Sequence, residues 1–233
     1  LIIFSQNCEK KPVFRIDHFK VYKIDSLAAI IPIHVDLKDQ FAKTSAGVSS
    51  PEYFANPVSK NGQRIIDSTA HLAWHKLVDD TPVESRAIRV INQFGKFRWK
   101  LGKAVYLLVP THKIEKGSQF PEKLDHFKCY EILAGEELQR KVILEDQFDR
   151  KLNRKEKVVV EKPLFFAVPV SKNGGEIFNK SDHLACYHIA PNPTPTDSMK
   201  VSFENQFGKG TLTTRESYML CVPSKKYVLK EGK

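Results

Sequence analysis

Hydrophobic and polar residues alternate with a period of two along most of the chain, the pattern of strands that bury one face. The alternation is clearest in 19–24, 88–91 and 199–203. Two further apolar runs, 104–109 and 218–222, each end at a proline. Gly, Pro and Asn separate these segments at short intervals. The chain is therefore predicted to be all-β, built as a sandwich or a barrel.

The pattern occurs twice, because the stretch Asp17–Tyr22 (DHFKVY) returns as Asp125–Tyr130 (DHFKCY). Further landmarks keep the same order in both copies: 39–41 with 146–148, 57–62 with 169–174, 71–73 with 183–185, and 92–95 with 205–208. A tandem duplication explains this order. We predict an N-terminal extension at 1–16 and two homologous domains at 17–116 and 117–233, joined by a short charged linker.

Each copy also repeats internally, which predicts four related units of about fifty residues and a pseudo-twofold repeat in each domain. A unit opens with a histidine, carries a glutamine about 22 residues later and closes with Pro-x-x-Lys. The opening histidines are His18, His71, His126 and His183, the glutamines are Gln40, Gln93, Gln147 and Gln206, and the closing lysines are Lys60, Lys113, Lys172 and Lys226. Helical periodicity is weak, and short helical turns are expected only near 27–31 and 135–141.

The formal net charge of +10 is compatible with an anionic polymer as partner. Lysines are scattered among acidic residues without an arginine-rich stripe, so specific nucleic-acid binding is not predicted. The closing lysines of the four units are the candidate polyanion-binding or glycan-binding residues, because they recur at equivalent positions in all four units. The alternative is that these four lysines only keep strand ends soluble.

Four cysteines, Cys8, Cys129, Cys186 and Cys221, form no C-x-x-C pair, which disfavours zinc and redox motifs. The last three occupy positions that the first repeat fills with apolar residues, as expected for a disulfide in a secreted protein. A pair between Cys129 and Cys221 would join the first strand of the second repeat to its last. Buried free thiols are the alternative.

The opening histidines are the best candidates for metal ligands, and a metal-binding protein or enzyme centred on them is one hypothesis. Their recurrence in every unit instead favours a role in the shared fold, such as a side-chain hydrogen bond at the start of a strand. The chain has no nucleophile elbow, phosphate loop or dinucleotide fingerprint. We therefore predict no catalytic residues, no cofactor and no metal.

No run of eighteen apolar residues is present, so no transmembrane segment is predicted. The apolar start Leu1-Ile2-Ile3-Phe4 is interpreted either as the end of a signal region or as a strand that docks on a neighbour. Asn179 begins an Asn-Lys-Ser sequon, which has meaning only in a secreted chain.

The repeated motifs DHFKCY, DQF, PVxK, HLxCY, NQFG and LCVPSxK resemble an uncharacterised family of tandem all-β domains in secreted or surface proteins of microbes. The resemblance implies an exported location and no known activity. The sequence thus predicts a non-enzymatic secreted or cell-surface structural or interaction protein, with protein partners or self-association. A subunit of an extracellular assembly or filament fits this prediction. The alternatives are the polyanion or glycan binder and the histidine-centred metal protein.

Overall fold

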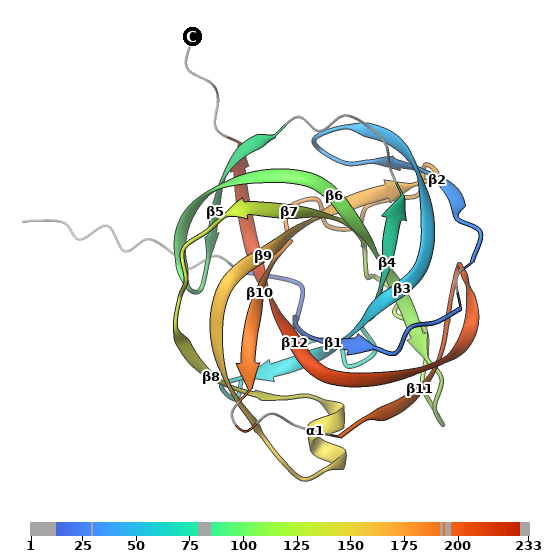
Figure 1. Cartoon of the computed structure of the whole chain (residues 1–233), viewed down its shortest axis with the longest axis vertical. Coiled ribbons are helices and arrows are strands. Elements are labelled where there is room, and N and C mark those ends of the chain that lie inside the picture. Colours follow the sequence, from blue (N-terminus) through green and yellow to red (C-terminus); the bar gives the residue numbers. More distant parts are fainter. Residues whose placement is uncertain (1–12, 29, 79–84, 192, 194–196, 229–233) are drawn as a thin grey trace, which may run out of the picture.

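The computed structural model describes residues 13–28, 30–78, 85–191, 193 and 197–228. This part of the chain is almost entirely strand and forms one antiparallel sheet of twelve strands (Figure 1). The strands are β1 His18–Ile24, β2 Ile33–Lys38, β3 Lys43–Lys60, β4 His71–Val78, β5 Arg86–Asn92, β6 Gly95–Lys113, β7 His126–Ala134, β8 Arg140–Glu145, β9 Glu156–Lys172, β10 His183–Pro191, β11 Met199–Asn205 and β12 Gly208–Val228. The all-β prediction is confirmed.

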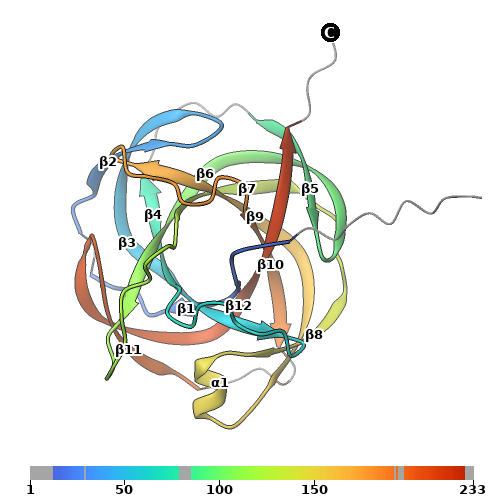
Figure 2. The ribbon, with the colours of Figure 1, turned by 180° about the vertical axis from the view of Figure 1, so that it is seen from behind.

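Eight of the strands close into a ring, seen end-on in Figure 1. Its order is β1-β3-β4-β6-β7-β9-β10-β12, and β12 pairs with β1 to complete it. The ring has no free edge, and a closed sheet satisfies the backbone of every member strand. Viewed from behind, the loops that lead into β1, β4, β7 and β10 lie across the near end of the ring (Figure 2).

The twelve strands form four units of three strands each, which we number 1 to 4: residues 18–60, 71–113, 126–172 and 183–226. In each unit a short ring strand is followed by a short outer strand and then by one long strand. In unit 1 the first part of the long strand, Lys43–Val48, pairs with the outer strand β2. The second part, Tyr53–Val58, pairs with the ring strand β1. The register shifts around Pro51, and such a bulge bends a strand from one layer into another.

The outer strands also pair with the unit two places away around the ring. The strand β2 extends β9, β8 extends β3, β5 extends β12 and β11 extends β6. Units 1 and 3 are therefore interlocked, as are units 2 and 4. The predicted boundary near residue 116 separates two sequence repeats. The prediction that each repeat packs as its own domain is wrong, because both repeats contribute strands to one sheet and side chains to shared buried clusters.

Both faces of the ring strands are buried, since a core fills the ring and the outer strands cover its outside. The inner cluster takes side chains from all eight ring strands, with Trp74 fully buried among them. The largest outer cluster lies beneath the hairpins β5–β6 and β8–β9 and contains Trp99 and Phe166. This double burial explains why ring strands such as β10 (HLACYHIAP) contain long apolar runs.

The turns Asn61-Gly62 and Asn173-Gly174 have positive φ at all four residues, so the tight turns predicted there are confirmed. The helical turn expected at 135–141 is absent, and so is any helix among the described residues of 27–31. The helix is instead α1, Gln147–Lys151, which Asp146 caps by accepting hydrogen bonds from the backbone amides of Phe148 and Asp149.

Candidate functional site

The opening histidines contact the glutamine of the next unit, so these contacts run once around the ring. Gln93 pairs with His18, Gln147 with His71, Gln206 with His126, and Gln40 with His183. The four histidines thus stand on four different ring strands, each joined to a separate glutamine. No group of three or more metal-ligating side chains with suitable geometry occurs in the part of the chain that the structure describes.

The closing lysines follow the same circular order, because each lies over a phenylalanine ring of the next unit. Their Nζ atoms lie 4.0 to 5.9 Å from the ring centroids, a cation–π distance; the pairs are Lys60–Phe94, Lys113–Phe148, Lys172–Phe207 and Lys226–Phe41. Burial lowers the pKa of all four ammonium groups, and that of Lys226 falls to about 8. These lysines sit at four separate junctions between units, and polyanion binding by all four stays a prediction.

A third set of contacts links opposite units through the residue before each glutamine. The Tyr22 hydroxyl donates to Asp146 at 2.8 Å, and the Tyr130 hydroxyl donates to Asp39 at 2.6 Å. At the other two positions the asparagine amide lies opposite the partner: Asn92 Nδ2 donates to the Tyr187 hydroxyl at 2.9 Å, and Asn205 Nδ2 lies 3.1 Å from His75 Nε2. The repeated polar residues therefore connect units, both neighbouring and opposite, around one closed structure.

The buried histidines are held neutral by their surroundings. Burial, with a contribution from nearby lysines, lowers the pKa of His18 and His71 to about 3. Burial likewise lowers the pKa of His75, His126 and His183 to about 4. A neutral imidazole keeps one nitrogen as an acceptor, which matches the glutamine amides opposite the four opening histidines and the Asn205 amide opposite His75.

A buried charge cluster surrounds Lys20 on β1, and sequence reasoning did not identify it. Its Nζ lies 2.6 Å from carboxylate oxygens of both Asp149 and Glu156 and 3.8 Å from Asp146. The ammonium group is inaccessible to solvent. Burial alone would lower the pKa of Lys20. The three nearby carboxylates raise this pKa by a larger amount, so the net shift is upward. Lys20 is therefore a charged tie between units 1 and 3.

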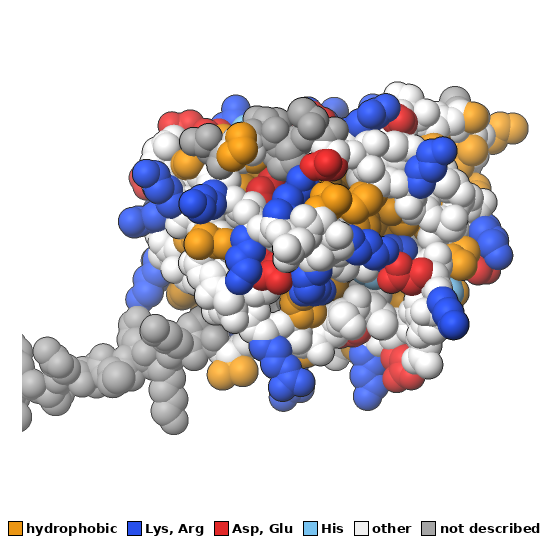
Figure 3. All heavy atoms as spheres, turned by 90° about the horizontal axis from the view of Figure 1, so that it is seen from below, with side chains coloured by type: hydrophobic (Ala, Val, Ile, Leu, Met, Phe, Trp, Pro, Cys, Tyr) orange, Lys and Arg blue, Asp and Glu red, His pale blue; other side chains and the backbone are white. Residues whose placement is uncertain are grey.

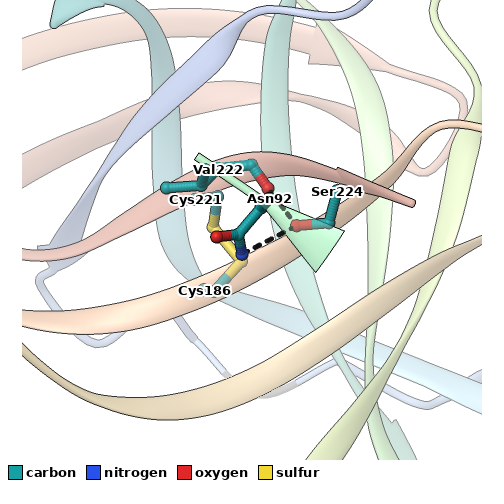
Figure 4. The surroundings of a disulfide bond; sticks show 5 residues. All are labelled: Asn92, Cys186, Cys221, Val222 and Ser224. Carbon is teal, nitrogen blue, oxygen red and sulfur yellow. Dashed lines mark hydrogen bonds between the residues drawn. A yellow bond between two sulfur atoms is a disulfide. The ribbon is translucent and has the colours of Figure 1, made fainter. Parts of the chain in front are cut away.

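The disulfide joins Cys186 and Cys221, which are directly paired on β10 and β12 with Cα atoms 4.0 Å apart (Figure 4). The predicted pairing of Cys129 with Cys221 is wrong, because Cys129 lies on β7, which pairs with β6 and β9 and not with β12. Cys129 is a buried free thiol. Next to the disulfide, Ser224 Oγ donates to the Val222 carbonyl and accepts from the Asn92 amide.

Reduction of this disulfide is expected to lower the free energy of unfolding by about 2–4 kcal/mol, because the bond closes a loop between positions 35 residues apart and restricts the unfolded chain. Urea unfolding with and without reductant measures the change. The Cys186→Ala/Cys221→Ala variant should match the reduced protein to within about 1 kcal/mol. Equal stability of oxidised and reduced protein would contradict the expectation.

The Asn179 side chain is already engaged in the loop before β10. Its Oδ1 accepts hydrogen bonds from the backbone of Ser181 and Asp182, and its Nδ2 donates to Asp182 at 2.8 Å. Asp67 makes a similar turn with Thr69 in the corresponding loop of unit 2. Asn179 thus has a structural role in the turn, and a glycan on Nδ2 stays a prediction. The proposed docking strand Leu1–Phe4 lies outside the described residues.

Figure 3 shows Lys and Arg side chains spread over one face, with Asp and Glu side chains among them. No described helix is both long and apolar enough to cross a membrane.

The family of the chain follows from a match to a family model over residues 71–223, which spans more than half of the sequence. That model describes a repeat of unknown function, DUF7450, and the chain belongs to this family. The match confirms the predicted membership of an uncharacterised repeat family. No curated protein and no solved structure matches the chain.

Proposed function

We propose that the protein is a non-enzymatic interaction module of a secreted or cell-surface protein, which associates with further copies of itself. The observation that carries this proposal is a run of exposed isoleucines at the start of β2, Ile30, Ile31 and Ile33, here called the isoleucine patch. Ile31 is 89% exposed, and Ile30 and Ile33 are 41% and 45% exposed. Adjacent exposed aliphatic side chains are typical of surfaces that bind another protein.

The patch is anchored to the sheet through β2 and β3. Ile33 is paired with Val48, and the neighbouring Pro32 lies close to Gly47 on β3. A side chain at Gly47 would come within 2.9 Å of the Pro32 Cβ atom, so the glycine permits this close packing. The end of the patch at Ile33 is therefore held by the sheet.

The non-enzymatic part of the proposal is supported by the use of the repeated polar groups. The histidines, glutamines and lysines that recur in every unit are engaged with one another across unit boundaries. An exported location is supported by the disulfide, which is typical of oxidising compartments. Residues that a catalytic hypothesis would require are thus already employed in holding the ring closed.

Sedimentation of the native protein over a range of concentrations tests self-association. The wild-type chain is expected to form oligomers, and the Ile31→Asp/Ile33→Asp variant is expected to remain a monomer, because two charges cannot be buried in an apolar contact. Phe178→Asp is the matched control, since Phe178 is 52% exposed and lies away from the patch. A variant that lacks residues 1–5 measures how much the N-terminal segment contributes to self-association. A wild-type monomer at all concentrations would refute the proposal.

A further inference from the structure

A cavity of about 240 Å³ lies where unit 2 meets unit 3. The loop before β4, the segment after β6 and the first turn of α1 form its walls. His71 and Lys113 line it from unit 2, Arg150 lines it from α1, and Lys116 follows on the linker. Glu115 is the single carboxylate among the lining residues, so three cations face one anion. The cavity therefore has an excess of positive charge.

His71 supplies a hydrogen-bond donor that the protein does not use. Lys113 donates to Gln147 Oε1, and Gln147 Nε2 donates to Asn56 Oδ1 at 2.9 Å, so the orientation of the Gln147 amide is defined. The same amide nitrogen lies 3.4 Å from His71 Nε2, which makes that ring nitrogen the acceptor. The proton of the neutral ring is therefore on Nδ1.

The Nδ1 atom of His71 is buried and has no hydrogen-bond partner. The equivalent atom of His183 lies 3.0 Å from the Ser181 carbonyl oxygen, so the missing acceptor distinguishes unit 2 from unit 4. A buried donor without an acceptor carries a free-energy cost, because it has lost its hydrogen bond to water. A ligand oxygen would relieve this cost.

Lys113 adds a second buried donor group to the same cavity. It is 4% exposed, and its ammonium group contacts Glu115 at 2.8 Å. Glu115 also contacts the exposed Lys151, so its charge is shared between two lysines. Arg150 and Lys116 are exposed at the rim, where they can approach a ligand that enters from solvent. Charged donors of this kind bind sulfate and phosphate oxygens strongly.

We propose that this cavity binds a tetrahedral oxyanion, sulfate or phosphate, either free or as an ester group on an acidic polysaccharide. His71 and Lys113 provide the inner donors, and Arg150 and Lys116 provide the rim. The site lies outside the isoleucine patch and does not depend on self-association.

NMR titration of the protein with sodium sulfate, with sodium phosphate and with dextran sulfate tests the site. Uncharged dextran is the control polymer. We expect the His71 side-chain nitrogen signals to shift with a saturable response to at least one of the three anions. Tighter binding of dextran sulfate than of free sulfate, counted per sulfate group, identifies the polymer as the source, and equal binding identifies the free ion.

Two variants separate a defined site from general attraction to a basic surface. Arg150→Gln leaves the buried residues intact and should weaken binding about tenfold, as expected for the loss of one charged contact. Lys100→Gln removes an equal charge from an exposed position on β6 and should leave binding unchanged. His71→Phe should abolish the saturable response. Unshifted His71 signals, or equal weakening by Arg150→Gln and Lys100→Gln, would overturn the proposal.

Discussion

Acidification from pH 6.5 to 5.5 is expected to destabilise the protein by on the order of 5 kcal/mol. Five histidines have folded-state pKa values of about 3 to 4, below the value of 6.5 in an unfolded chain. In this range the unfolded chain takes up protons that the folded protein does not, so stability falls as the pH falls. Each histidine contributes about 1 kcal/mol over the interval.

Urea unfolding at a series of pH values measures the loss, which is large compared with the usual stability of a domain, about 5–15 kcal/mol. Burial raises the pKa of Asp17 and Asp125, so protonation of these carboxyl groups favours the folded protein at lower pH. The change in stability above pH 5.5 therefore reports on the histidines. Replacement of His126 by Asn should reduce the slope by the share of one histidine. A flat profile, or histidine NMR titrations centred near 6.5, would disprove the expectation.

The Lys20→Met variant is expected to lose about 3–5 kcal/mol of stability, because it removes the buried cation that Asp149 and Glu156 share. Removing one partner of a buried ion pair costs far more than removing an exposed pair. Lys23→Met is the matched control on the same strand. Lys23 pairs with Glu216, and both side chains are more than 40% exposed, so its loss should cost at most about 1 kcal/mol.

Urea unfolding near neutral pH compares the two variants with the wild-type protein. A triple variant that replaces Lys20, Asp149 and Glu156 by apolar residues should recover part of the lost stability, since Asp146 is then the one carboxylate of the cluster that still lacks Lys20. Equal stability of Lys20→Met and Lys23→Met would show that the cluster around Lys20 is not the tie described here.

The sequence was sufficient to predict the strands, the four units and the tight turns, because each depends on local periodicity or on residues repeated in order. The closed ring was not predictable in this way. Similar units could form one closed sheet within each repeat or a single closed sheet from both repeats. The sequences of β2 and β9 do not indicate that these two strands pair. The prediction of two packed domains failed at this point.

The buried charge cluster was missed for a related reason. Lys20 lies within a repeated motif, but its partners Asp149 and Glu156 are 129 and 136 residues away. The cysteine pairing shows the same limit, since it required knowing that β10 and β12 are neighbours. The motif around Asp146 did contain a detectable signal: an Asp followed three residues later by another acid is typical of a helix start, and it marks α1.

The ring does not depend on where the chain is cut. The strands β12 and β1 are neighbours in the ring just as β6 and β7 are, although only the second pair is joined by a linker. A circularly permuted chain that starts at β7, with a new linker from β12 to β1, should therefore reach the same ring. The same equivalence allows a single repeat to complete a ring by pairing with a second copy of itself. Duplication of an ancestral gene for such a paired half would have joined two chains that already formed one molecule.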